Sequence, residues 1–412
     1  MKLRYLLLSV SIVVCCSTRA QHSKISPEPG IAKSRQVMVH PEHSSTIITE
    51  VAGEVSINSD TPKWNQRLVS FAKKHELPEK IRKEKEERTK AKGEAPGHYY
   101  PDESNAVLSN PKIGVNFRAN LFDGYTPPDN SMAVSSNGII VTVTNSHLEY
   151  YNGLGQNISS ISFADFFNDP AFTGNIYDPV VLFDSGADRF FMVVLHSSSS
   201  ATSRVVACFS KSADPSDGWY YYKLTGNPLN NGCWFDYPKI GVSSNEVYIT
   251  GNLFSDANVF NQSIIYQITK EGGYSGTALG WQYWQNISES PFTLVPASYG
   301  LQGNYGPGIY FIATKDNETS DCYYLYDLTD DMTGSPQLKA FAINASFSLA
   351  GDAYQLGTGV LMDNGETRGL SAFYLNGVLH FVHNAEYANN YNGLSYNRLD
   401  ISALSNWSST FG

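Results

Sequence analysis

The stretch Tyr177-Asp-Pro-Val-Val-Leu-Phe-Asp184, then Ser185-Gly-Ala-Asp188 and Arg189-Phe-Phe-Met-Val-Val-Leu195, reads as a short apolar strand, a tight turn and a stronger apolar strand. The same unit occurs five times, and its second strands begin at residues 139, 189, 247, 309 and 378. A unit that is built only of strands and recurs at intervals of about 50 to 70 residues is typical of propeller blades. The sequence therefore predicts an all-β fold, a β-propeller of about five to six four-stranded blades around a central channel.

Further strands complete the predicted blades. Third strands are expected at Arg204–Ser210, Ser263–Thr269, Cys322–Leu328 and Gly393–Asp400, and fourth strands at Trp219–Leu224 and Gln337–Ile343. Runs such as Phe190–Leu195 are apolar throughout, as expected for strands that neighbouring blades cover on both faces. A strand over Lys112–Ala119 could close the ring, or the ring is incomplete; the sequence leaves both readings open.

The chain divides into three regions. Residues 1–20 have a basic start, a short apolar run over Tyr5–Cys16 and a small residue at Ala20, which predicts a signal peptide cleaved after Ala20. Residues 21–110 read as a polar leader followed by a charged helix or linker, separable from the propeller. The propeller itself is expected over 111–412, with the possibility that its C-terminus is truncated. We therefore expect a secreted or cell-surface protein without a transmembrane segment, since no later run approaches about 20 apolar residues.

Charge and cysteine content narrow the function classes. From residue 94 onward, 12 basic side chains stand against 29 acidic ones, so nucleic acid and anionic membranes would repel this region. After signal removal three cysteines remain, which allows at most one intramolecular bridge. We predict a Cys208–Cys233 disulfide, because the strands around them are neighbours in the repeat, and a buried thiol at Cys322. The chain is expected to be a monomer.

The chain resembles a family of secreted bacterial β-propeller proteins over residues 111–400. The resemblance rests on Asp123-Gly-Tyr-Thr-Pro-Pro-Asp129, Tyr177-Asp-Pro-Val-Val-Leu-Phe-Asp184, Ser212-Ala-Asp-Pro-Ser-Asp-Gly-Trp219 and Trp234-Phe-Asp-Tyr-Pro-Lys-Ile-Gly241. Members of this family are mostly uncharacterised modules at the cell surface or in the medium, and the family is loosely similar to sialidase-type propellers. The stretch from Ser212 to Trp219 is similar to the Asp-box, a turn between outer strands that marks the fold rather than an active site.

Three recurrent aspartates are the best candidates for a site. Asp129, Asp178 and Asp236 each open a predicted first strand, and first strands line the channel of a propeller. Converging carboxylates there could bind Ca²⁺ or accept hydrogen bonds from sugar hydroxyls. The alternative is structural, with each aspartate accepting backbone N–H groups of the adjacent turn. No other cofactor is expected.

The arginines of the propeller region bear on whether the protein is a sialidase-like enzyme. Such an enzyme needs three arginines that grip a carboxylate, and Arg118 and Arg368 are the ones expected to face the channel. The acidic turn Asp363–Glu366 is interpreted as a solvated loop. The leading interpretation is an exported, non-enzymatic binding module for an extracellular glycan or a surface protein. The alternatives are a sialidase-like glycoside hydrolase or lyase and a structural scaffold without a ligand.

Overall fold

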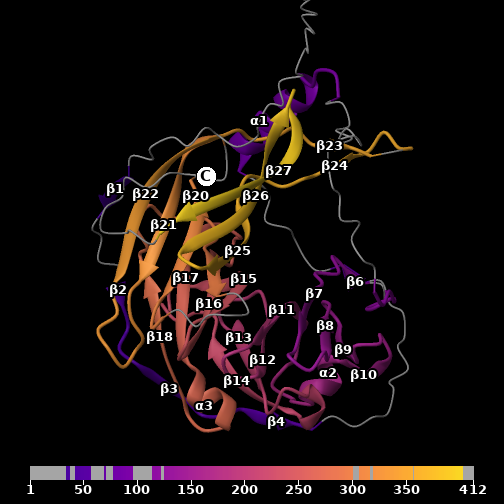
Figure 1. The fold of residues 1–412 in the computed structure, drawn as a ribbon, viewed down its shortest axis with the longest axis vertical. Helices are drawn as coiled ribbons and strands as arrows, with labels where there is room; N and C mark the ends of the chain where they lie inside the picture. The colour runs from indigo at the N-terminus through magenta and orange to yellow at the C-terminus, as the bar shows by residue number, and fades with distance from the viewer. Residues whose placement is uncertain are drawn as a thin grey trace, which may run out of the picture.

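The computed structural model describes residues 34–37, 42–56, 69–70, 78–95, 114–121, 125–299, 306–315, 319–355 and 357–401. The predicted signal peptide and its cleavage site lie outside the described residues. Strands make up most of the described chain, which confirms the all-β prediction (Figure 1). Among the helices of the described ranges, none is long and apolar enough to cross a membrane.

Antiparallel meanders form the blades. The first three are β7–β10 (Ser131–Val134, Ile140–Val143, His147–Tyr151, Asn157–Ser162), β11–β14 (Ile176–Asp184, Arg189–His196, Arg204–Ser210, Trp219–Thr225) and β15–β18 (Cys233–Val242, Glu246–Ser255, Phe260–Thr269, Leu279–Gln285). The fourth is β19–β22 (Val295–Tyr299, Ile309–Thr314, Ser320–Leu328, Leu338–Phe347), and the fifth is β25–β27 (Gly369–Leu375, Val378–Ala388, Tyr391–Asp400). First strands of successive blades contact each other, and β19 pairs in parallel with β25. The blades follow one another along an arc, the predicted propeller arrangement (Figure 1).

The repeat was predicted closely at its second strands. These are β8, β12, β16, β20 and β26, and each begins within about one residue of its predicted start. The predicted third and fourth strands are also present, as β13, β17, β21, β27, β14 and β22. The expected strand over Lys112–Ala119 is not formed in its described part, since residues 114–121 carry no strand. The first blade is already complete with four strands of its own chain segment.

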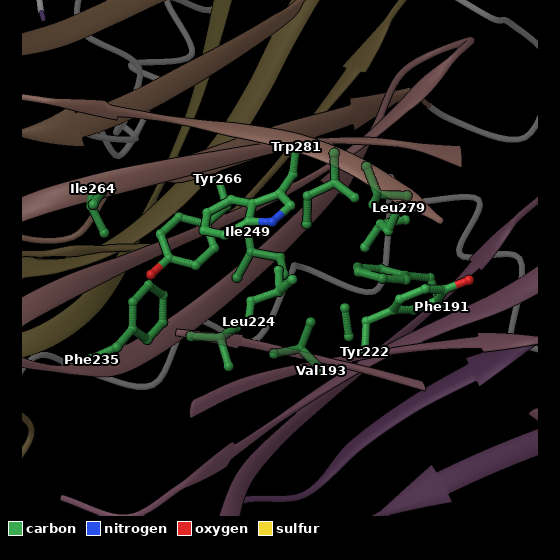
Figure 2. Packing of buried hydrophobic residues seen from close by; sticks show 14 of the residues in the cluster. Phe191, Val193, Tyr222, Leu224, Phe235, Ile249, Ile264, Tyr266, Leu279 and Trp281 are labelled. Carbon is green, nitrogen blue, oxygen red and sulfur yellow. The ribbon is translucent and has the colours of Figure 1, made fainter. Parts of the chain in front are cut away.

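Apolar side chains pack between neighbouring blades rather than in one central core. On β12, Phe191, Val193 and Leu195 point to the third blade, whereas Phe190 and Met192 point to the first. The cluster between the second and third blades also contains the residues of Figure 2, which shows aromatic rings and branched side chains meeting from both sheets. Covering both faces explains why β12 is apolar throughout instead of alternating.

The Asp-box-like stretch forms a turn between the outer strands β13 and β14, as expected. Asp214 caps a short 3₁₀ helix, η1 (Pro215–Asp217), by accepting from the Ser216 backbone N–H at 2.9 Å. Trp219 is buried and its Nε1 donates to the Tyr150 hydroxyl at 2.9 Å, across to the first blade. None of these residues lines the cavity described below. The stretch therefore stabilises the fold.

The leader adds strands to the outer edges of the blades. β4 (Gly53–Val55) pairs with β14, β2 (Glu42–His43) and β3 (Ile47–Thr49) pair with β18, and β1 (Ser34–Val37) pairs with β22. From the sequence we predicted a separate leader here, because strands this short show no alternation of apolar and polar residues. That this region can be separated from the propeller stays a prediction.

The charged helix α1 (Glu79–Lys90) also docks onto the propeller. Although the sequence indicated only a charged helix or linker here, two of its side chains, Ile81 and Lys85, are buried. The Lys85 ammonium lies 2.7 Å from Asp352 and also pairs with Asp363, both in the segment that precedes the fifth blade. The short hairpin β23–β24 (Ala353–Tyr354, Leu361–Met362) lies between these two aspartates in the chain.

The remaining elements are short. β5 (Val69–Ser70) pairs in parallel with β6 (Tyr125–Thr126). The helices α2 (Phe163–Phe167) and α3 (Lys270–Ser275) connect the first blade to the second and β17 to β18.

The predicted Cys208–Cys233 disulfide is wrong. Cys208, Cys233 and Cys322 are all buried free thiols. Cys208 packs between the first and second blades, whereas Cys233 packs between the second and third. Strands that are neighbours in the repeat can point their side chains into different interfaces, and the sequence period does not specify which. The prediction of a buried Cys322 thiol is confirmed.

Candidate functional site

A cavity of about 930 Å³ opens where the first strands begin. Its walls come from the segment before β7, the early parts of β11 and β15, the end of β12 with its loop, and the segment before β25. Four of the predicted site residues line this cavity, namely Asp129, Asp178, Asp236 and Arg368. The fifth, Arg118, does not line it and lies exposed in the segment 114–121. The structure thus brings together side chains that are far apart in the sequence.

Backbone irregularities aim the aspartates. Asp129 and Asp178 have left-handed φ values of 41° and 48°, and Tyr237, next to Asp236, has 56°. The register of β11 against β12 shifts at Asp178, and that of β15 against β16 shifts just after Asp236, which are β-bulges. Asp178 and Asp236 therefore lie inside their strands, at the bulge, and do not open them as predicted. Left-handed non-glycine residues store strain and concentrate at functional sites.

Asp178 is at the centre of a carboxyl cluster. Its carboxyl group shares hydrogen bonds with those of Asp236 and Asp129. Burial, followed by the charges of Asp236 and Asp129, raises the pKa of Asp178 well above its ordinary value. A proton on Asp178 thus relieves the repulsion that three adjacent carboxylates would otherwise produce.

Asn145 clamps this cluster from the first blade, and sequence reasoning missed it. Its Nδ2 donates to Asp129 Oδ2 at 2.5 Å and to the Pro127 carbonyl at 2.9 Å. Its Oδ1 accepts from the Asp178 backbone N–H at 2.6 Å, so one buried amide joins the first two blades. An asparagine in a turn after a strand is common, and its sequence position gave no signal of this role.

Two basic side chains also line the cavity: Lys239 of β15 and Arg368, which precedes β25. Arg368 pairs with Glu366 and lies over the rings of Tyr237 and Phe292, at 4.6 Å and 5.1 Å from their centroids. Lys239 donates to the Leu370 carbonyl at 3.2 Å. Burial, and then the nearby Arg368 charge, lowers the pKa of Lys239.

Glu366 corrects the reading of the acidic turn 363–366 as a solvated loop. Its side chain is only 2% exposed and lines the cavity. Burial acts to lower the pKa of the Arg368 guanidinium, but the pairing with Glu366 outweighs this effect, and the pKa is raised. The negative charge of Glu366 compensates the positive charge of Arg368. Arg368 therefore differs from an arginine whose guanidinium is available to bind the carboxylate of a substrate.

Aromatic side chains complete the walls. Trp234, Tyr177 and Tyr237 line the cavity. Trp234 is held by a hydrogen bond from its Nε1 to the Ser255 carbonyl at 3.1 Å. By contrast, Trp219 and Tyr222 pack between blades.

Metal binding was a further prediction for Asp129, Asp178 and Asp236. Within the described ranges, no group of three or more His, Cys, Asp or Glu side chains is arranged to hold a metal ion. The calcium site stays a prediction of the sequence.

No protein-family model matches the chain, and no curated protein matches it. Among solved structures, it is similar to an α-L-arabinanase of Cellvibrio cellulosa complexed with arabinohexaose, with 14% identity, a TM-score of 0.31, and coverage of 66% of this chain and 91% of the other. It is also similar to the polysaccharide lyase Uly1, at 8% identity and a TM-score of 0.38, covering 65% of this chain and 57% of the other. A xylan β-1,4-xylosidase from Bacillus halodurans C-125 matches at 10% identity and a TM-score of 0.32, covering 66% and 52%.

Proposed function

We propose that this chain is an extracellular carbohydrate-binding protein and that the cavity holds the sugar. The observation that carries the proposal is the meeting of Asp129, Asp178 and Asp236 with the aromatic side chains Trp234 and Tyr237 in one cavity. Carboxyl oxygens accept hydrogen bonds from sugar hydroxyls, and aromatic rings cover the apolar faces of sugars. A concave site with a few converging polar groups is the usual form of a small-molecule site.

A glycan array tests this proposal with matched variants. Wild type, Asp236→Asn in the cavity and Asp321→Asn on the surface are compared, the side chain of Asp321 being 85% exposed and outside the cavity. We expect wild type and Asp321→Asn to bind the same defined set of glycans, and Asp236→Asn to lose about tenfold or more in affinity, the equivalent of about 1.4 kcal/mol. Absence of binding by wild type, or equal binding by all three proteins, contradicts the proposal.

Glycoside hydrolysis is the second candidate, and the raised pKa of Asp178 favours it. Hydrolysis needs one carboxyl group that donates a proton and a second that is ionised. Asp178 has the environment of the donor, and Asp129 and Asp236 are the adjacent candidates for the second group. Arg368 is the arginine that lines the described cavity, so this reading uses carboxyl chemistry rather than an arginine triad.

A panel of chromogenic glycosides separates hydrolysis from binding. If the chain is a hydrolase, wild type turns over at least one substrate and Asp178→Asn lowers its kcat by about a hundredfold or more. Binding on the array without turnover of the corresponding glycosides excludes this candidate.

Export, oligomeric state and partner class belong to the same proposal. We expect the mature chain to start at Gln21, to be a monomer, and to meet its glycan, or a surface protein that carries it, outside the cell. N-terminal sequencing of protein recovered from the medium tests the first point, since an intact Met1 contradicts it.

A further inference from the structure

One wall of the cavity comes from the segment 348–368, which joins the fourth blade to the fifth. Four residues at its end line the cavity, namely Asp363, Gly365, Glu366 and Arg368. Apart from the two-residue strands β23 and β24, the described part of this segment has no regular structure. A backbone that is not paired into a blade keeps its position only through contacts with other parts of the chain.

Helix α1 packs against the beginning of this segment. Gly351 approaches the helix so closely that a Cβ at this position would lie 2.7 Å from the backbone nitrogen of Thr89. The Thr89 hydroxyl accepts from the Asp352 backbone N–H at 2.8 Å, and the Lys92 ammonium donates to the Asp352 carbonyl. The Gly351 carbonyl in turn accepts from Asn364 Nδ2 at 3.0 Å, which connects the two ends of the segment.

Lys85 connects α1 directly with the cavity wall. Its side chain is only 3% exposed, and its ammonium lies 2.7 Å from Asp352 Oδ1 and also contacts Asp363 Oδ1. The same Asp363 oxygen accepts from the Gly365 backbone N–H at 2.9 Å. One carboxylate therefore joins a buried cation of the helix to the backbone of a turn that lines the cavity.

The fifth blade holds the acidic turn 363–366 from another element. Asn384 of β26 donates from its Nδ2 to the Asn364 carbonyl at 2.8 Å. Helix α1 itself supplies none of the residues that line the cavity, so any effect of the helix on a ligand passes through this turn. Because adjacent carboxylates repel each other unless a cation compensates them, loss of the Lys85 charge would drive Asp363 away from Asp352 and displace the turn.

We propose that α1 is a supporting part of the sugar site and that Lys85 is a positioning residue, which holds the turn 363–366 where Glu366 and Arg368 line the cavity. The inference deepens the proposed function and rests on it for the ligand. It assigns a role in binding to a helix that lies outside the propeller region predicted from the sequence. A wall that is fixed before the ligand arrives lowers the entropic cost of binding, so detachment of α1 weakens binding of the sugar.

Hydrogen exchange followed by mass spectrometry tests the positioning without a ligand. Wild type is compared with Lys85→Met and with Lys83→Met, the side chain of Lys83 being 63% exposed. We expect the backbone amides of residues 363–368 to exchange at least several-fold faster in Lys85→Met and at the wild-type rate in Lys83→Met. Equal exchange of this segment in all three proteins overturns the inference. If Lys85→Met does not fold, Lys85→Gln is judged in the same way, and failure of both to fold makes Lys85 a core residue and overturns the inference.

Affinity for a glycan that wild type binds on the array gives the second readout. Lys85→Met is expected to lose about tenfold or more in affinity, whereas Lys83→Met keeps the wild-type value and Lys85→Arg, which retains the positive charge, keeps most of it. Equal affinity of Lys85→Met and wild type, or equal losses in Lys85→Met and Lys85→Arg, overturns the role of the Lys85 charge while the proposed function stands. Absence of wild-type binding to every glycan overturns the proposed function and the ligand assigned here, and the exchange measurement then decides by itself whether Lys85 positions the turn.

Discussion

Asp178 lies between two other carboxyl groups, and its protonation makes the stability of the protein depend on pH. Its folded-state pKa is raised above that of the unfolded chain, so the folded state binds the extra proton between the two values. Stability from this group is therefore greatest in acid and falls as pH rises above the unfolded pKa of about 4. We predict that the Tm of Asp178→Asn, measured relative to wild type, increases as the pH rises above about 4.

The same melts separate a proton from a cation. A difference in Tm between the two proteins that is constant with pH contradicts a protonated Asp178. A Ca²⁺-dependent rise in the wild-type Tm, abolished by chelator and absent in Asp178→Asn, would instead establish the calcium site predicted from the sequence, by mass action on the folded state.

Asn145 carries a second prediction at this scale. Asn145→Ala removes the donor to Asp129 and the acceptor for the Asp178 backbone N–H, which leaves buried groups unsatisfied. We expect the free energy of unfolding to fall by about 2 kcal/mol, measured by urea denaturation. Asn152→Ala, in an exposed turn of the first blade, is the control and should change it much less. Equal losses in both variants contradict the clamp.

Individual site residues were predictable only where they recur. Asp129, Asp178 and Asp236 stand at similar places in successive repeats, so the sequence alone pointed to them. Asn145 and Glu366 occur once each, and their roles depend on contacts with other blades. The left-handed backbone at Asp178 was also outside the reach of sequence patterns, because aspartate before proline is common in ordinary turns.

Helix α1 makes a prediction at the scale of elements. Its buried Lys85 pairs with Asp352 and Asp363, so the wild-type helix is protected despite its many basic residues. We expect Lys85→Ala to release the helix and to make trypsin cleavage within residues 80–92 at least several-fold faster than in wild type, as followed by mass spectrometry. Lys83→Ala, whose side chain is 63% exposed in its pair with Glu79, is the matched control. Equally fast cleavage of all three proteins shows a helix that is not docked.

Elements with a strong local signal were predicted well, and those defined by their partners were not. The second strands of the blades are apolar runs bounded by turns, and such runs predict strands without knowledge of the partner. The leader strands β1–β4 have two to four residues each and are strands because they pair with outer edges of blades. The docking of α1 likewise depends on one lysine and two distant aspartates.

Blade packing makes a prediction for the whole molecule. Cys208, Cys233 and Cys322 lie in three different interfaces between blades, and burial raises the pKa of each thiol. We expect these cysteines to resist iodoacetamide in the native state and to become alkylated over one common range of urea concentration, since the blades support each other. Alkylation of one cysteine at much lower urea, or a Cys208–Cys233 peptide in a non-reduced digest, contradicts this packing.

The propeller arrangement places segments from four blades around one cavity. The sequence could indicate that such a cavity exists, but not which segments form its walls. The repeat predicted that first strands meet, and hence that aspartates in them approach each other. The volume of the cavity, the part played by the end of β12 and the exclusion of Arg118 follow from three-dimensional packing.

The central claim is that this cavity binds a sugar, and isothermal titration calorimetry with the best array ligand tests it most directly. The account predicts one site per chain for wild type, an unchanged Kd for Asp321→Asn, and at least tenfold weaker binding for Asp236→Asn and Asp129→Asn, which alter walls of the same cavity that come from different blades. Wild-type affinity in both cavity variants would place the sugar elsewhere on the molecule and contradict the account.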